Sequence, residues 1–322
     1  MLNFQDLPDE LVLKILGYSE TKDLITYGQV SKRIRKISHD GTLWVTANFV
    51  KKIVTTELLE IILGKECKIL KISNTTIVGS LSSNVKYQLT ALEFSWSVLP
   101  ETLPGHKYYA ENIDVLEKLL LSCCSLQHLK IEGYFLTPKM ASSICNNGKT
   151  LQVLNLNHSY IIDHPYSPAG NLQIIIEWCR ELKELSFIKK EENCLRKDDL
   201  EFLAKNISPN VVKLNLSNHD VNDDLLKILL SRCNKIKVLI LEATIITENS
   251  LKTIRQYLNL TLEELSWAYY WTFPSFLELK SMPKLQILKL YTSKGDDDKR
   301  IQNLRQHLPH LMIRTHSGHS PY

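Results

Sequence analysis

The stretch Leu285-Gln-Ile-Leu-Lys-Leu290 contains the pattern that decides the fold. An apolar residue is followed by two variable residues, a second apolar residue, one variable residue and a third apolar residue. The last two apolar positions are two residues apart, so on a β-strand both side chains point to the same face. The pattern occurs ten times, at residues 67–72, 89–94, 126–131, 151–156, 182–187, 211–216, 236–241, 262–267, 285–290 and 308–313. A repeated pattern of this kind predicts a stacked array of similar units.

The segments between these copies have helical character. Residues 222–233 begin with the acids Asp223 and Asp224, which suit a helix N-terminus, and continue with Leu225 and Leu229 at helical spacing. Successive copies begin 22 to 37 residues apart, as from 67 to 89 and from 89 to 126. The strand pattern and its spacing resemble leucine-rich repeats. The resemblance implies an α/β solenoid shaped like a horseshoe, with parallel strands on its concave face and helices outside.

Three cysteines share one place in this pattern. Cys123, Cys179 and Cys233 each lie three residues before the first apolar position of a copy. This place resembles the cysteine-containing subclass of leucine-rich repeats, which implies a small apolar side chain packed at the end of the outer helix. None of the seven cysteines forms a C-x-x-C pair, and reduced thiols are expected. We therefore predict no catalytic, disulfide or metal-binding cysteine.

The first 45 residues do not follow the repeat. Pro8 suits the first turn of a helix, and Leu11, Val12, Ile15 and Leu16 form a wide apolar stripe behind it. Two further short helices are expected, from about residues 21 and 31. Three short helices cannot bury this much apolar surface by themselves. The pattern therefore indicates a protein partner.

These residues resemble the F-box, which reads Leu-Pro-x-Glu-apolar, then Val-(Cys/Ser)-(Lys/Arg)-x-Trp, and ends with Leu-Trp. The matching residues are Leu7, Pro8, Glu10, Leu11, Ile15, Leu24, Val30, Lys32, Leu43 and Trp44. The chain departs from the usual pattern at Ile34, where Trp is commonest, and at Ser19, where Leu is usual. The resemblance implies that the adaptor subunit of an SCF ligase contacts Leu7, Pro8, Glu10, Leu11, Ile15, Leu24, Val30, Ile34 and Trp44.

An F-box joined to cysteine-type repeats resembles the F-box/leucine-rich-repeat family. Membership implies a substrate-recognition subunit of an SCF-type (cullin-RING) E3 ubiquitin ligase, which binds cullin and RING subunits through the adaptor and has no catalytic residue of its own. The expected organisation is an F-box at 1–45, a linker helix region at 46–66, repeats at 67–313 and a flexible tail at 314–322. An alternative is a scaffold or inhibitor whose N-terminal helices only cap the solenoid. A cap would pack its apolar stripe against residues 67–72, whereas an F-box would leave Leu7, Pro8, Leu11 and Ile15 accessible.

Aromatic residues indicate where a protein substrate would bind. Tyr269 and Trp271 follow the eighth strand, and Tyr291 and Lys289 are expected on the concave face of the ninth. Neighbouring strands lie about 4.8 Å apart, so these side chains could form one site. Tyr and Trp are frequent anchors of protein interfaces. We therefore predict substrate binding at Tyr269, Trp271, Tyr291 and Lys289.

Several other function classes are disfavoured. The 39 basic and 35 acidic residues give a net charge of only +4, which does not favour nucleic-acid binding. The N-terminus is acidic where a signal peptide would be basic, and no apolar run suits a membrane span, so a cytoplasmic or nuclear protein is expected. The sequence contains no phosphate loop, nucleophile elbow or zinc-protease motif. We expect no enzyme activity, cofactor or metal.

Overall fold

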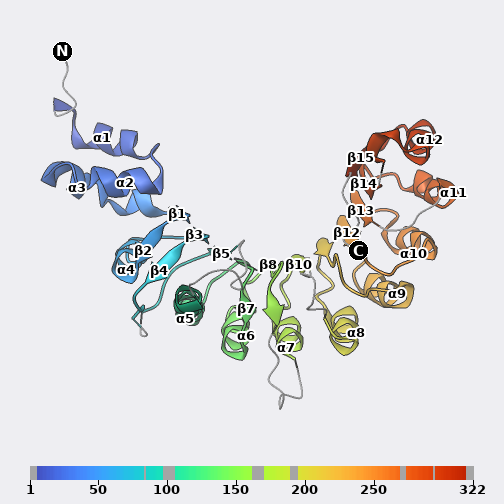
Figure 1. Cartoon of the computed structure of the whole chain (residues 1–322), viewed down its shortest axis with the longest axis horizontal. Helices are drawn as coiled ribbons and strands as arrows, with labels where there is room; N and C mark the ends of the chain where they lie inside the picture. The colour runs from blue at the N-terminus through green and yellow to red at the C-terminus, as the bar shows by residue number, and fades with distance from the viewer. Residues whose placement is uncertain are drawn as a thin grey trace. The chain divides into compact units, whose positions relative to one another are not determined.

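The computed structural model describes residues 6–82, 85–96, 106–161, 170–188, 195–268, 273–292 and 294–316 (Figure 1). The chain divides into two compact units, one ending at Tyr134 and the other beginning at Phe135. Both units are built from strands that alternate with helices. Within the described residues, no helix has the length and apolar character needed to cross a membrane.

The first unit opens with three short α-helices and a 3-10 turn. They are α1 (Asp9–Leu16), α2 (Thr21–Tyr27), α3 (Lys32–Ser38) and η2 (Gly41–Trp44). Local capping explains two of the starts. The Ser31 side chain accepts a hydrogen bond from the Ile34 amide at the start of α3, and Asp40 accepts one from the Thr42 amide at the start of η2.

The rest of the first unit is a parallel sheet with helices behind it. Its elements are β1 (Thr46–Val50), β2 (Ile53–Thr55), α4 (Thr56–Leu63), β3 (Ile69–Ser73), β4 (Thr76–Val78), β5 (Ala91–Ser95), α5 (His106–Ser122) and β6 (His128–Glu132). The strand order is β1-β3-β5-β6, and β2 pairs with β4 in a small separate sheet. The pairing aligns Ala47, Leu70, Leu92 and Leu129 in one row, and all four are buried. This row is the second apolar position of successive repeats.

The second unit continues the same pattern. It contains β7 (Phe135–Leu136), α6 (Pro138–Cys145), β8 (Val153–Asn155), β9 (Tyr160–Ile161), α7 (Asn171–Trp178), β10 (Glu184–Ser186), α8 (Lys197–Asn206), β11 (Lys213–Asn215), α9 (Asp223–Arg232), β12 (Val238–Glu242), α10 (Asn249–Leu258), β13 (Glu264–Ala268), α11 (Phe273–Phe276), η4 (Leu277–Ser281), β14 (Ile287–Tyr291), η5 (Gly295–Asp297), α12 (Lys299–His307) and β15 (Met312–His316). The strands β8-β10-β11-β12-β13-β14-β15 are paired in this order, each parallel to the next, and β7 pairs with β9.

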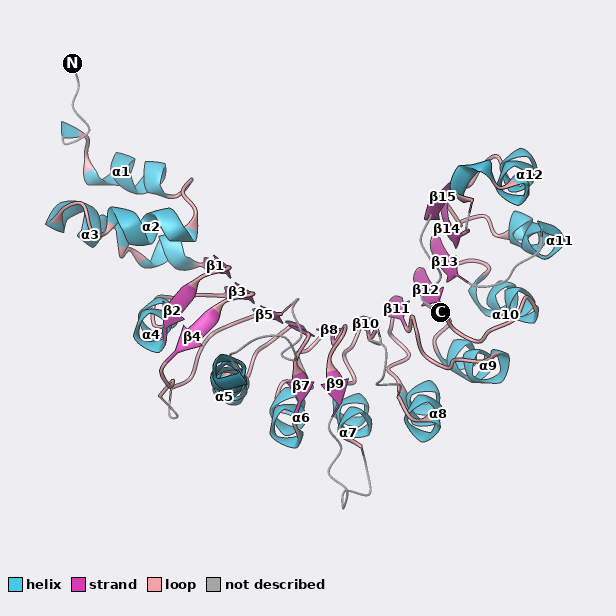
Figure 2. Cartoon of the chain, in the orientation of Figure 1, coloured by secondary structure: helices cyan, strands magenta, loops and turns pink. Residues whose placement is uncertain are grey.

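The second unit is a two-layered solenoid. Figure 2 shows its helices on one side of its strands. We call the other side the open face of the sheet. A buried row of Leu154, Leu185, Leu214, Leu239, Leu265, Leu288 and Ile313 runs across the seven strands. Fully burying each such side chain stabilises the fold by about 1.5–3 kcal/mol. Each of the ten repeats expected from the sequence therefore supplies one strand.

The structure differs from the expected organisation at both ends of the repeats. Residues 46–66 were expected as a linker helix region, but they contain strand β1 as well as α4. Trp44, Ala47 and Phe49 have the spacing of the repeat pattern, and all three are buried. The segment is thus an additional repeat. The sequence pattern alone did not indicate it, because Ala47 is small and Trp44 also matches the end of the F-box. At the other end, β15 runs to His316 and includes the first residues of the expected tail.

A buried asparagine on α5 joins this helix to the small sheet. Asn112 Oδ1 accepts a hydrogen bond from the Ile77 amide at 2.9 Å, and its Nδ2 donates to the Thr75 carbonyl at 2.9 Å. Asn112 is completely buried. The buried Ile77 amide and the buried Thr75 carbonyl therefore depend on the Asn112 side chain for these hydrogen bonds.

We predict that Asn112→Ala lowers the free energy of unfolding by about 2–3 kcal/mol, because it leaves a buried amide and a buried carbonyl unsatisfied. Chemical denaturation of the full chain measures this loss. Asn303→Ala on the exposed side of α12 is the matched control, and should change stability by less than about 0.5 kcal/mol. Equal effects of the two substitutions would contradict the role given to Asn112.

Candidate protein-binding surfaces

Helix α1 carries two neighbouring apolar pairs, of which only one is covered. Val12 and Leu16 are buried against the rest of the first unit. Leu11 and Ile15, one residue earlier in each turn, are 48% and 46% exposed. Pro8, at the N-cap of the helix, is also exposed. The folded chain thus leaves an apolar strip along α1 that its own residues do not cover.

An arginine from α3 holds the start of α1 in place. Arg33 Nε donates to Asp9 Oδ1 at 2.9 Å, and Arg33 Nη2 donates to the Leu7 carbonyl. The ion pair is largely exposed and contributes little to stability by itself. The bond to the backbone of Leu7 is more important for geometry, since it fixes the point from which the exposed strip begins.

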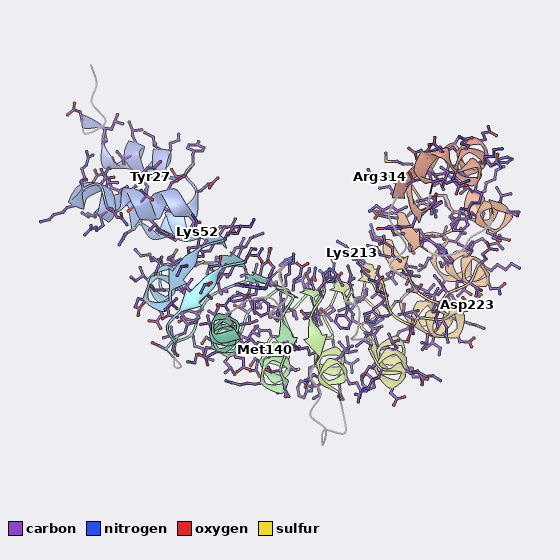
Figure 3. The ribbon with its side chains drawn as sticks, viewed as in Figure 1. Tyr27, Lys52, Met140, Lys213, Asp223 and Arg314 are labelled. Carbon is purple, nitrogen blue, oxygen red and sulfur yellow. The ribbon has the colours of Figure 1, made fainter. Side chains whose placement is uncertain are left out.

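Further apolar side chains are exposed near the turn between α2 and α3. Val30 is 71% exposed and Tyr27 is exposed as well, and Tyr18, in the turn between α1 and α2, is also exposed. Tyr27 is labelled in Figure 3, at the end of α2. Leu7 and Ile34 are partly buried, and Glu10 is exposed. Seven of the nine predicted adaptor-contacting residues therefore have some accessible surface.

The other two predicted adaptor-contacting residues lie in the interior. Leu24 and Trp44 are buried, and Trp44 Nε1 donates a hydrogen bond to the Ser38 carbonyl at 2.7 Å. Trp44 also occupies the first apolar position of the β1 repeat. In this structure both side chains support the fold and offer no surface to a partner. The sequence match could not show this, because a residue can match the motif whether its side chain is buried or exposed.

The edge of the sheet is covered by a different part of the F-box region. Strand β1 pairs with β3, and the Asn48 amide on β1 donates to Thr21 Oγ1 on α2 at 3.0 Å. Helix α2 therefore contacts the edge strand, while Leu11 and Ile15 of α1 remain about half exposed. This is the arrangement expected of an F-box and not of a simple cap.

The basic run of α3 is partly used inside the chain. Arg33 contacts Asp9 and Leu7, and Arg35 Nε donates to the Gly28 carbonyl at 2.7 Å. Lys32 and Lys36 are exposed. The two arginines thus help to assemble the three helices.

Two of the four predicted substrate-contacting residues lie outside the described residues, namely Tyr269 and Trp271. The other two, Lys289 and Tyr291, lie on the open face of β14 and are partly buried. Lys289 Nζ forms an ion pair with Glu264 Oε1 at 2.5 Å. Burial, the nearby charge of Glu242 and a hydrogen bond to Glu242 raise the pKa of the Tyr291 hydroxyl. Lys289 is therefore held by an acid on the adjacent strand β13, and Tyr291 by an acid on β12, one strand further along.

Charges on the open faces are mostly paired within the chain. The ion pairs are Lys71–Glu93 and Lys130–Glu132 in the first unit, and Lys213–Glu184 and Lys289–Glu264 in the second. Lys213 and Arg314, both labelled in Figure 3, lie on the side of the strands away from the helices. The Arg314 guanidinium contacts the Met312 sulfur. The open face therefore presents few unpaired charges to a partner.

Comparisons with known proteins agree with this architecture. Residues 4–49 match the model of the F-box-like family. A chain of the Rad7 and Elc1 complex in yeast has a similar fold, with a TM-score of 0.50 and 15% identity, over 95% of this chain and 91% of that chain. The leucine-rich repeat-containing protein LegL7 from Legionella pneumophila gives a TM-score of 0.44 and 14% identity, over 83% of this chain and 89% of its own. The chain thus has an F-box-like domain at its N-terminus, and the repeats that follow have the fold of leucine-rich repeats.

The three recurring cysteines of the repeats are buried. Cys179 and Cys233 cap the ends of α7 and α9, and Cys123 follows the end of α5. Burial raises the pKa of Cys123 and Cys179 to about 12 and that of Cys233 to about 11, so all three thiols are neutral at pH 7. In the described parts of the chain, no three or more His, Cys, Asp or Glu side chains form a group that could hold a metal ion. This environment suits packing.

We predict that replacing Cys123, Cys179 and Cys233 by Ala lowers the melting temperature, because each change removes a packed sulfur from the interior. Differential scanning fluorimetry measures the shift, and Cys124→Ala is the control because Cys124 is exposed. Metal analysis of the wild type and the triple variant completes the test. Loss of a stoichiometric metal in the variant would show that the thiols are ligands.

Proposed function

We propose that this protein is the substrate receptor of an SCF-type ubiquitin ligase. The observation that carries the proposal is the F-box-like domain whose helix α1 leaves Leu11 and Ile15 half-exposed on an otherwise packed structure. An apolar strip of this kind favours burial against a partner. The partner expected of an F-box is the adaptor subunit, which connects the receptor to the cullin and RING subunits.

The repeats would hold the protein substrate. Such a receptor accelerates ubiquitin transfer by bringing the substrate close to the charged conjugating enzyme, which raises the effective concentration of the reacting groups. This mechanism needs no catalytic residue in the receptor, so we propose a non-enzymatic role in the cytoplasm or nucleus. The fold neighbour in yeast belongs to a complex of two proteins, Rad7 and Elc1, which fits a fold that works in assemblies.

The open face of the second unit is the proposed substrate-binding surface. Its lysines already pair with glutamates, so strong electrostatic attraction of a highly charged substrate is not expected. Apolar and aromatic contacts would supply the affinity, with Tyr291 at the proposed site together with Tyr269 and Trp271. Lys289 would contact the substrate at the rim of the same site.

We predict that Leu11→Ala with Ile15→Ala weakens adaptor binding at least tenfold. The substitutions remove apolar surface that the adaptor would bury, and Ala keeps the helix intact. Co-purification and a binding isotherm with the purified adaptor measure the effect; Leu7→Ala with Pro8→Ala should act in the same direction. Leu260→Ala with Ile228→Ala removes exposed apolar surface in the second unit and is the control. Undiminished adaptor binding by both F-box variants would refute the receptor hypothesis and favour the scaffold or inhibitor.

The substrate site gives a separate prediction. Trp271→Ala with Tyr291→Ala should remove proteins that co-purify with the wild type, while adaptor binding and the melting temperature stay close to wild type. Tyr291→Phe keeps the ring and removes only the hydrogen bond to Glu242, so it should retain these proteins. Quantitative mass spectrometry of the purified complexes measures both outcomes. If the double variant mainly lowers the melting temperature, the two rings are part of the core and the site lies elsewhere.

A further inference from the structure

A pocket of about 300 Å³ lies between the F-box helices and the first repeat, within the first unit. Its lining comes from α2, α3, η2, α4 and the turns that follow α2, α3 and α4. The lining residues are Leu24, Ile25, Gly28, Gln29, Arg35, His39, Trp44, Leu58, Ile61, Ile62 and Lys65. This volume is at the lower end of the range for small-molecule sites. The exposed strip of α1 supplies none of these residues, so the pocket is separate from that strip; Leu24 and Trp44, two of the predicted adaptor-contacting residues, are in its lining.

One wall of the pocket is apolar from its floor to its opening. Leu24, Trp44 and Ile62 are buried and form the floor. Ile61, on the outer side of α4, is 49% exposed. A concave apolar surface that reaches solvent can accept the apolar body of a ligand.

Two cations in the pocket have only neutral partners. Arg35 Nε donates to the Gly28 carbonyl at 2.7 Å, and Lys65 Nζ donates to the His39 carbonyl. Among the described residues, neither side chain forms an ion pair with a carboxylate. A guanidinium has five N–H donors and an ammonium three, so most of these donors are available to a ligand. Anionic groups form the strongest hydrogen bonds with such donors.

The electrostatic environment of the pocket is positive. Burial lowers the pKa of Lys65, and only the charge of Asp40 opposes this effect. The Asp40 carboxylate itself accepts hydrogen bonds from the amide and hydroxyl of Thr42. Burial, and then the charges of Lys65 and Arg35, lower the pKa of His39. A negative charge placed in the pocket would offset the cost of keeping Lys65 charged in a partly buried position.

We propose that this pocket binds a small amphipathic organic anion. Its carboxylate, sulfonate or phosphate head contacts Arg35 and Lys65, and its apolar body lies against Ile61 and the floor formed by Leu24, Trp44 and Ile62. Because the F-box region supplies Arg35 and the first repeat supplies Lys65, a bound anion links the F-box helices to the repeat that follows them. This ligand site goes beyond the proposed receptor function and does not depend on it.

The test uses a matched pair of fluorescent probes with the purified full chain. 1-Anilinonaphthalene-8-sulfonate is an amphipathic anion, and N-phenyl-1-naphthylamine has the same aromatic body without the sulfonate. We expect the anion to bind saturably and at least tenfold more tightly than the neutral probe, since it gains charge-assisted hydrogen bonds. Lys65→Gln and Arg35→Gln should each weaken binding of the anion about tenfold and leave binding of the neutral probe unchanged.

Control variants separate this site from other apolar surface. Lys68 lies outside the pocket lining and its Nζ donates to Gln88 Oε1, so Lys68→Gln should bind the anion as the wild type does. Leu11→Ala with Ile15→Ala removes the exposed strip of α1 and should also retain binding. Lys65→Arg keeps the charge and should retain most of the affinity, which controls for loss of folding in the glutamine variants. Equal affinity of the two probes, or unchanged anion binding by both glutamine variants, would overturn the proposal.

Discussion

Each strand–helix repeat of this protein has an apolar edge that only the next repeat can cover, and the rest of the structure depends on this constraint. The second apolar position of each repeat from β1 to β14 lies in a buried row, from Ala47 to Leu129 in the first unit and from Leu154 to Leu288 in the second. In the last repeat the third apolar position, Ile313, takes this place beside Leu288. A polar side chain in such a row would be buried against the apolar residues of both neighbouring repeats. The same stacking brings the helices to one side of the strands and leaves the opposite face of the strands uncovered by helices.

The first edge of the sheet has no preceding repeat to cover it. Strand β1, which follows directly from the F-box helices, forms this edge, and Thr21 of α2 accepts a hydrogen bond from the Asn48 amide of β1. Trp44 belongs to both structures, since it ends the F-box motif and fills the first apolar position of the β1 repeat. The F-box region is therefore packed against the repeats through α2 and η2, and the outer strip of α1 stays exposed.

The open faces show how charge is distributed once neighbouring strands are brought together. In several repeats, a lysine and a glutamate lie at nearby register positions on adjacent strands. Parallel pairing of the strands places them within ion-pair distance. These exposed pairs contribute little to stability. Their main consequence is that each lysine charge is offset by a carboxylate next to it on the open face.

The sequence by itself determined the repeated strands, the three N-terminal helices and the apolar stripe of α1, whereas only the structure showed which part of this stripe stays exposed. All of these follow from local periodicity, because a spacing of two residues or of three and four residues already assigns a side chain to a face. Tertiary structure alone decided that Trp44 and Leu24 are buried, that residues 46–50 form an edge strand, and that Lys289 and Tyr291 are held by Glu264 and Glu242. It also decided that Arg35 and Lys65 meet beside one apolar pocket, although thirty residues separate them in the chain. The physical reason is that burial and charge pairing depend on which segments become neighbours in space, and one segment's pattern does not contain that information.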